Sequence, residues 1–113
     1  PSFTWKVLKQ ADTPRQREDN ESEFKTWNKL KESKFYRENL AQTFLCTSDD
    51  KYLVMERVNP IESYDPKASD FADKMQDKVV RDLGLKRDNV DVHGSAIGIK
   101  NGSYKVYDYP WIR

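Results

Sequence analysis

The sequence predicts an α+β domain in which a small, mainly antiparallel sheet packs against two principal helices. Two β-rich runs, 43–47 and 52–58, are joined by a short polar segment whose length suits a hairpin. The Asn101-Gly102 pair between two further β-rich runs is the strongest short-range signal for a second hairpin. Apolar residues that recur every four positions between residues 66 and 83 predict the more regular of the two helices.

The first third of the chain predicts a strand, a loop and a helix. Residues 3–8 carry alternating apolar positions and are expected to form a short strand. The polar stretch 10–19, which contains a proline, is expected to be a mobile loop. Asn20 and Glu23 have the spacing of an N-cap and its capping-box partner, so we expect the helix to begin at Glu21. Apolar residues at helical spacing give this helix one stripe: Phe24, Trp27 and Leu30.

The second helix has clear start and stop signals. Asp65 precedes Pro66, and proline is favoured at the first position of a helix. Gly84 can end the helix in a left-handed conformation. Pro60 is expected to end the strand that comes before it. The apolar positions of this helix are Ala68, Phe71, Ala72, Met75, Val79 and Leu83.

The composition predicts one folded domain, 1–113, with almost no net charge. Twenty Lys and Arg against 19 Asp and Glu leave +1, so no basic field indicates a nucleic acid or an anionic membrane as partner. No apolar run approaches the roughly 18 residues that span a membrane. The single cysteine, Cys46, cannot form an internal disulfide, and it is expected to be a small core residue. No signal peptide is visible and Pro1 suggests a trimmed initiator methionine, so we expect a cytoplasmic protein.

The last third carries two aspartates, Asp91 and Asp108, separated by the predicted hairpin. In the protein-kinase family a catalytic-loop aspartate is followed five residues later by a metal-binding asparagine, and a second, metal-binding aspartate follows a short hairpin. Asp91 and Asp108 stand at the two acidic positions, on either side of the Asn101-Gly102 turn. The chain therefore resembles the protein-kinase family, and the resemblance implies a catalytic role for Asp91 and a metal-binding role for Asp108.

The resemblance extends through most of the chain in the family's order. The run 52–58, which includes Glu56, looks like the strand and hinge that carry adenine in kinases. Lys9 or Lys6 is similar to the phosphate-binding lysine of the family, and Glu21 or Glu23 to the helix glutamate that pairs with it. The implied fold is a reduced protein-kinase-like core, and the implied cofactor residues are Lys9, Glu21, Glu23, Glu56 and Asp108.

Departures from the kinase pattern favour a protein that no longer catalyses. Ala96 stands where the family has its metal-binding asparagine, and a methyl group cannot bind a metal ion. Pro110 replaces the glycine of the Asp-Phe-Gly motif and removes a backbone donor. The printed chain is also expected to lack the glycine-rich loop and most of the second lobe. We therefore expect a pseudokinase-like regulator or inhibitor of a partner enzyme, or a homodimer, that needs no cofactor.

Its partner would meet apolar surface that the missing parts leave uncovered. Four residues at the C-terminus are candidates for this contact: Tyr107, Tyr109, Trp111 and Ile112. The alternative is that they fold back onto their own domain. A small, degenerate kinase-like core of this kind would suit a bacterial or bacteriophage protein that interferes with a host enzyme.

Two other functions stay open from the sequence. The first is a minimal kinase or nucleotide-binding protein that uses Mg-ATP. Its polar centre would consist of Lys9, Glu21 or Glu23, Asp91 and Asp108. The second is a nucleic-acid-binding protein, which the near-zero net charge makes the weakest reading. It would use lysines of the first helical region: Lys25, Lys29, Lys31 and Lys34. His93, the only histidine, could act as a base or metal ligand, but such a residue more often satisfies a local backbone group.

Overall fold

The computed structural model describes residues 5–113, and its helices and strands confirm the α+β class. Phe3 and Pro1 lie outside the described residues. In chain order the elements are β1 (Lys6–Gln10), α1 (Pro14–Leu30), α2 (Lys34–Asn39), β2 (Thr43–Cys46), β3 (Tyr52–Glu56), β4 (Asn59–Pro60), α3 (Pro66–Leu83), β5 (Ile97–Lys100) and β6 (Ser103–Val106). Two short 3-10 turns, η2 (Arg87–Asn89) and η3 (Gly94–Ala96), connect α3 to β5.

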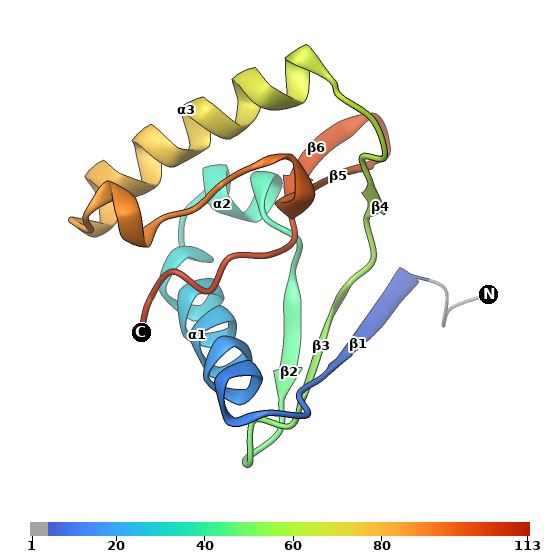
Figure 1. The fold of residues 1–113 in the computed structure, drawn as a ribbon, viewed down its shortest axis with the longest axis vertical. Helices are drawn as coiled ribbons and strands as arrows, with labels where there is room; N and C mark the ends of the chain where they lie inside the picture. Colours follow the sequence, from blue (N-terminus) through green and yellow to red (C-terminus); the bar gives the residue numbers. More distant parts are fainter. Residues whose placement is uncertain (1–4) are drawn as a thin grey trace.

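The strands form two separate three-stranded antiparallel sheets, where the sequence had predicted one. The first sheet has the order β1-β3-β2 and the second has the order β4-β5-β6. In Figure 1, α1 lies beside the first sheet and α3 crosses above the second. The C-terminal segment then runs back from β6 towards α1, so it passes between the two halves of the molecule (Figure 1).

The first helix begins earlier than predicted, so the expectation of a loop over 10–19 was wrong. Thr13 is the N-cap, and its hydroxyl accepts a hydrogen bond from the Gln16 N–H at 3.2 Å. The Gln16 side chain in turn accepts from the Thr13 N–H at 3.1 Å, which completes a capping box. Pro14 occupies the first helical position, where its missing donor costs nothing. The proline that suggested a loop therefore starts the helix.

Both predicted hairpins are confirmed. β2 and β3 pair antiparallel with one irregularity between Thr43 and Leu45. β5 and β6 pair around Asn101 and Gly102, which have φ values of 53° and 79°. Positive φ at both central residues is the geometry that an Asn-Gly turn favours.

The predicted bounds of α3 are confirmed, but Pro60 has a different place from the one expected. The Asp65 side chain accepts from the Lys67 N–H at 3.0 Å, and Gly84 ends the helix with φ 64°. β3 ends at Glu56, and Pro60 belongs to the separate edge strand β4, opposite Gly98. A Cβ on Gly98 would lie 2.7 Å from the Asn59 carbonyl oxygen, so glycine allows β4 to approach.

One hydrophobic cluster joins both sheets and the three helices. Its fully enclosed members come from distant parts of the chain: Leu40, Ala41, Leu53, Met55, Val79, Val90, Ile97, Val106 and Tyr109. Cys46, expected in the core, is only half-buried, and its thiol donates to an Asp50 carboxylate oxygen at 3.4 Å. No helix within residues 5–113 combines the length and the apolar character needed to cross a membrane.

Candidate functional site

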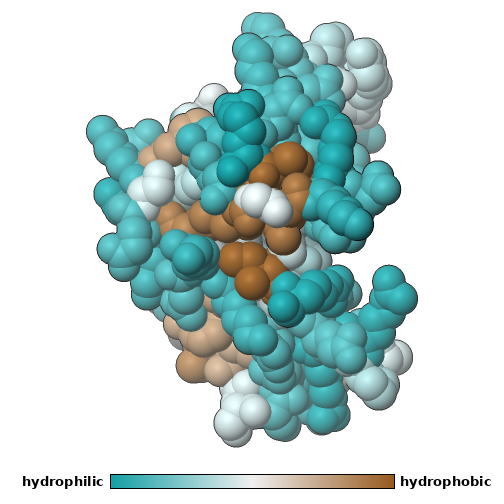
Figure 2. Space-filling model, turned by 90° about the vertical axis from the view of Figure 1, so that its left-hand side faces the viewer, coloured by the Kyte–Doolittle hydropathy of each residue, from teal (hydrophilic) through white to brown (hydrophobic). Residues whose placement is uncertain are grey.

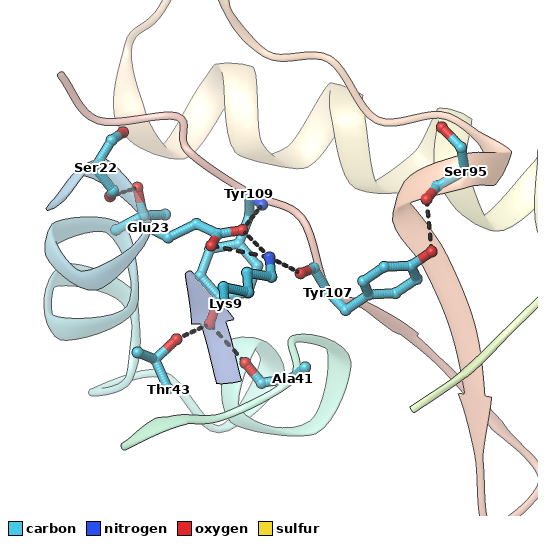
Figure 3. A network of polar contacts seen from close by, with 9 residues as sticks. Lys9, Ser22, Glu23, Ala41, Thr43, Ser95, Tyr107 and Tyr109 are labelled. Atoms are coloured by element: carbon cyan, nitrogen blue, oxygen red, sulfur yellow. Dashed lines mark hydrogen bonds and ion pairs between the residues drawn. The ribbon is translucent and has the colours of Figure 1, made fainter. Parts of the chain in front are cut away.

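The candidate site begins with an ion pair between β1 and α1. The Lys9 ammonium donates to both carboxylate oxygens of Glu23, at 2.9 and 3.0 Å, and to the Tyr107 carbonyl oxygen at 2.9 Å. The Tyr109 N–H donates to the same Glu23 carboxylate at 3.0 Å. Figure 3 shows the four groups converging from β1, α1 and the C-terminal segment. Three segments far apart in the sequence are therefore joined at one carboxylate.

Burial decides the electrostatics of this ion pair. The Glu23 side chain is 2% exposed, whereas that of Lys9 is 31% exposed. Burial raises the pKa of Glu23 from 4.5 to about 7, and the negative charge of Asp108 acts in the same direction. The Lys9 charge and the hydrogen bonds from Lys9 and Tyr109 oppose that shift. The carboxyl therefore titrates near neutral pH.

Backbone and hydroxyl groups hold the C-terminal segment against α1 and β2. The Ser22 hydroxyl donates to the Ile112 carbonyl oxygen at 2.6 Å, and the Ile112 N–H donates to the Thr26 hydroxyl at 3.0 Å. The Tyr109 hydroxyl donates to the Ala41 carbonyl oxygen at 2.6 Å and is bonded to the Thr43 hydroxyl at 2.6 Å (Figure 3). Burial raises the pKa of the Tyr109 hydroxyl, so this donor keeps its proton.

This arrangement corrects the expected role of the C-terminal aromatic residues. Tyr109 is 0% and Trp111 3% exposed, so both pack inside their own chain and neither is free to meet a partner. Tyr107 and Ile112 are half-buried, and the Tyr107 hydroxyl donates to the Ser95 carbonyl oxygen at 2.7 Å. The segment folds back because its backbone and aromatic groups find partners on α1, β2 and η3.

Asp91 and Asp108 line one hollow of about 600 Å³ beside the C-terminal segment. Asp91 is exposed, and its carboxylate lies 3.4 Å from Nε2 of His93. Nδ1 of His93 lies 2.5 Å from the Ser95 hydroxyl oxygen. The wall of the hollow also includes Arg15, Asn89, Pro110, Trp111 and Arg113. Among residues 5–113, no group of three or more His, Cys, Asp or Glu side chains is arranged to hold a metal ion.

Glu21 and Glu56 lie apart from the ion pair and from this hollow. Glu21 is exposed on α1 and pairs with Lys25 at 2.7 Å, one helical turn away. The Glu56 carboxylate is bonded to Lys100 and accepts from the Gln42 N–H at 2.9 Å. Burial alone would raise the pKa of Glu56, but the bonds from Lys100 and Gln42 hold it below its usual value. Glu56 therefore links the two sheets.

The remaining candidates have local roles. Lys6 lies over the rings of Trp5 and Phe44, at 4.4 and 4.6 Å from their centroids, so Lys9 is the lysine that reaches α1. Lys25 and Lys34, two of the lysines considered for nucleic acid, each form an ion pair within their own helix.

The residues that anchor the C-terminal segment were not predicted from the sequence. Ser22 and Thr26 are buried polar residues on α1, and they lie on the buried side of the helix together with Glu23 and Trp27. A run of polar residues on the buried side of an amphipathic helix is the signal that could have found them, because buried hydroxyls need partners. Their partners are backbone groups of Ile112, which the side-chain pattern does not reveal.

No protein-family model matches the sequence, and no curated protein is significantly similar to it. The chemistry of the chain must therefore be inferred from its own residues. The ion pair at Glu23 holds three segments together. Asp91 and Asp108 present carboxylate oxygens to the hollow of about 600 Å³ that both line. Ala96 is 1% exposed, and its side chain is a methyl group that cannot bind a metal ion.

Proposed function

We propose that the chain is a catalytically degenerate, protein-kinase-like module that acts by binding another protein, as a regulator or inhibitor of a partner enzyme. The Lys9–Glu23 pair between a strand and a helix supports the kinase-like part of the proposal, because that pair is a recurring element of kinase sites. Asp91 and Asp108 on one hollow support it further.

The proposed loss of catalysis is argued chiefly from the hydrogen bonds that Lys9 makes. A lysine ammonium has three N–H donors. Here the bonds reach both oxygens of Glu23 and the Tyr107 carbonyl oxygen, which leaves no donor for a phosphate unless one of these bonds breaks. Ala96 supplies no metal ligand, and Pro110 removes a backbone N–H after Asp108. Phosphate and metal binding are both weakened.

An apolar surface supports action through a protein partner. Figure 2 views the molecule from the left-hand side of Figure 1, where α1 and the C-terminal end of α3 lie, and it shows an apolar band among hydrophilic residues. Near that end of α3, Val80, Leu83 and Leu85 are only partly buried. Contiguous apolar surface with a polar border is typical of a protein-binding face.

A nucleotide-binding protein is the second candidate, and two observations favour it. Asp91 and Asp108 face the same hollow, where their carboxylates could serve a Mg²⁺-nucleotide. Trp111 also lines this hollow, and its buried indole N–H has no hydrogen-bond partner among the described residues. Buried donors are normally paired, so a ligand oxygen would complete this one if the indole ring shifted to expose it.

A thermal-shift titration with millimolar Mg-ATP, together with a radiolabelled ATP turnover assay, separates the two candidates. A ligand present at 100 times its Kd stabilises the native state by about 2.7 kcal/mol. We expect the wild type and Asp108→Ala to show no shift and no turnover. A shift or turnover that disappears in Asp108→Ala but persists in Asp70→Ala, which removes an exposed carboxylate on α3, would establish the nucleotide-binding candidate instead.

Light scattering of the pure chain gives the mass in solution and tests the homodimer form of the proposal. For a separate partner, the chain is immobilised, a captured enzyme is identified, and its activity is measured with and without added chain. A specific change in that activity at stoichiometric chain is the expected result. An unchanged activity for every captured enzyme, together with a monomeric mass, would count against a regulatory role.

A further inference from the structure

A second hollow, of about 470 Å³, lies between α3 and the segment that leads into β5. One wall is the loop 61–65, which joins β4 to α3 and can be followed in Figure 1. The other walls are the first half of α3 and residues 92–95. Apart from His93, none of these residues belongs to the hollow that Asp91 and Asp108 line. This groove is therefore a separate candidate for binding.

The floor of the groove is apolar. Ala68 and Ala72 lie one helical turn apart on the inner face of α3 and are 2% and 4% exposed. Val92, 5% exposed, and the half-buried Ile61 also line the groove. Because alanine side chains are small, α3 leaves room at this point for an apolar side chain from another molecule.

The charged residues around this floor are all acidic. Glu62, Asp65 and Asp73 line the groove together with His93, and no lysine or arginine among residues 5–113 does. Asp65 is occupied, since it caps α3 and accepts a hydrogen bond from the Tyr104 hydroxyl at 2.6 Å. Glu62 and Asp73 are exposed and form no ion pair within residues 5–113. Two exposed carboxylates beside an apolar floor can therefore form ion pairs with positive charges of another molecule.

Tyr64 adds an anchor at the border of the groove. It is 83% exposed, the most exposed of the large hydrophobic residues in the described chain. Tyrosine is enriched at the centres of protein interfaces, where its ring packs and its hydroxyl stays hydrogen-bonded. A nucleic acid would be repelled by the acidic border, whereas a basic protein segment matches it.

We propose that this groove docks a basic segment of the protein partner, with an apolar side chain on the Ala68–Ala72 floor and flanking Lys or Arg at Glu62 and Asp73. This inference rests on the proposed protein-binding function and names the chemistry of the partner. The apolar side chain supplies buried area, and the two charge pairs fix the direction of the segment.

Selection from a displayed library of random nonapeptides on the wild-type chain tests this assignment. The expected consensus is one large apolar residue with Lys or Arg on both sides. In fluorescence polarisation, a synthetic consensus peptide should bind Glu62→Lys/Asp73→Lys at least tenfold more weakly than the wild type. The matched control is Glu18→Lys/Glu32→Lys, which makes the same change in net charge at exposed positions outside the groove and should bind as the wild type does.

Amide shifts in a two-dimensional NMR spectrum locate the peptide. Changes concentrated at 61–73 and 92–95 are the supporting result, and thermal melts of the variants show that each is folded. Recovery of no enriched peptide, an acidic consensus, or equal binding by both double variants would overturn the groove assignment. Peptides that shift amide signals elsewhere would also overturn the groove assignment, but they would leave protein binding as the function. An Asp108-dependent response to Mg-ATP would instead contradict the proposed protein-binding function itself.

Discussion

Glu23 is the residue on which the proposed site depends most. Its carboxylate is buried, yet it receives Lys9 from β1 and the Tyr109 N–H from the C-terminal segment. Such a group is costly to leave without partners, because a buried charge keeps none of its hydration. The neighbouring acid Glu21, two positions earlier, is exposed and pairs with Lys25 on the same helix. Exposed pairs of that kind contribute little to stability.

The raised pKa of Glu23 predicts a specific dependence of stability on pH. The folded state keeps this proton up to about pH 7, whereas the unfolded chain loses it near 4.5. The stabilisation is therefore complete below 4.5 and is lost as the pH rises towards 7, at no more than about 1.4 kcal/mol per pH unit. Urea denaturation of the wild type between pH 5 and 8 should show this fall, and Glu23→Gln should lack it.

Glu21→Gln is the matched control, since the pKa of Glu21 is lowered by its hydrogen bond to Lys25. That variant should keep the wild-type fall in stability between pH 5 and 7. Parallel curves for the wild type and Glu23→Gln would mean that Glu23 is ionised throughout this range.

At the scale of elements, the start of α1 decides whether Glu23 reaches Lys9. The helix begins at Pro14 with Thr13 as its cap, so Glu23 lies in the helix interior and not in the first turn. Asn20, which the sequence suggested as the cap, is buried, and its side-chain amide donates to the Asp50 carbonyl oxygen at 3.0 Å. That bond ties α1 to the turn between β2 and β3.

Thr13→Ala should therefore lower the free energy of unfolding by about 1 kcal/mol, because it removes the acceptor for the Gln16 N–H. Chemical denaturation followed by circular dichroism measures the change. Ser33→Ala is the control, since Ser33 is the N-cap of α2 but makes no capping hydrogen bond, and it should cost clearly less. An equal effect of the two substitutions would place the start of α1 elsewhere.

At the scale of the whole molecule, the C-terminal segment closes the structure. The two sheets belong to different halves, and residues 107–112 pass between them and bond to α1, β2 and η3. Trp111 packs against Tyr109, with ring centroids 5.8 Å apart, in the one core that joins the halves. The aromatic end of the chain thus serves stability, and the proposed partner site is the groove beside Tyr64.

Trp111→Ala should destabilise the protein by about 3–5 kcal/mol, as expected when a large buried aromatic side chain is truncated. Tyr64→Ala should change the stability by less than about 0.5 kcal/mol, because its ring is in solvent. Thermal and urea denaturation of the two variants give the comparison. If Trp111→Ala were as stable as the wild type, the segment would be free for a partner, which is one of the two alternatives that the sequence left open.

The elements that could be predicted from the sequence are those with local signals. The Asn101-Gly102 hairpin needs positive φ at two adjacent residues, and α3 carries its own start, stop and apolar face between Asp65 and Gly84. The start of α1 was missed although its signal is local too, because Thr13, Pro14 and Gln16 form a capping box that was read as a loop.

How the elements meet follows from the tertiary structure. It selected Glu23 over Glu21 for Lys9, separated β4 from β3 into a second sheet, and buried Tyr109 and Trp111. Each of these outcomes depends on backbone groups, such as the Tyr107 carbonyl and the Ile112 N–H, that every residue carries and no sequence pattern marks. Their partners are fixed when the core closes, because a buried polar group must then find a hydrogen bond within reach.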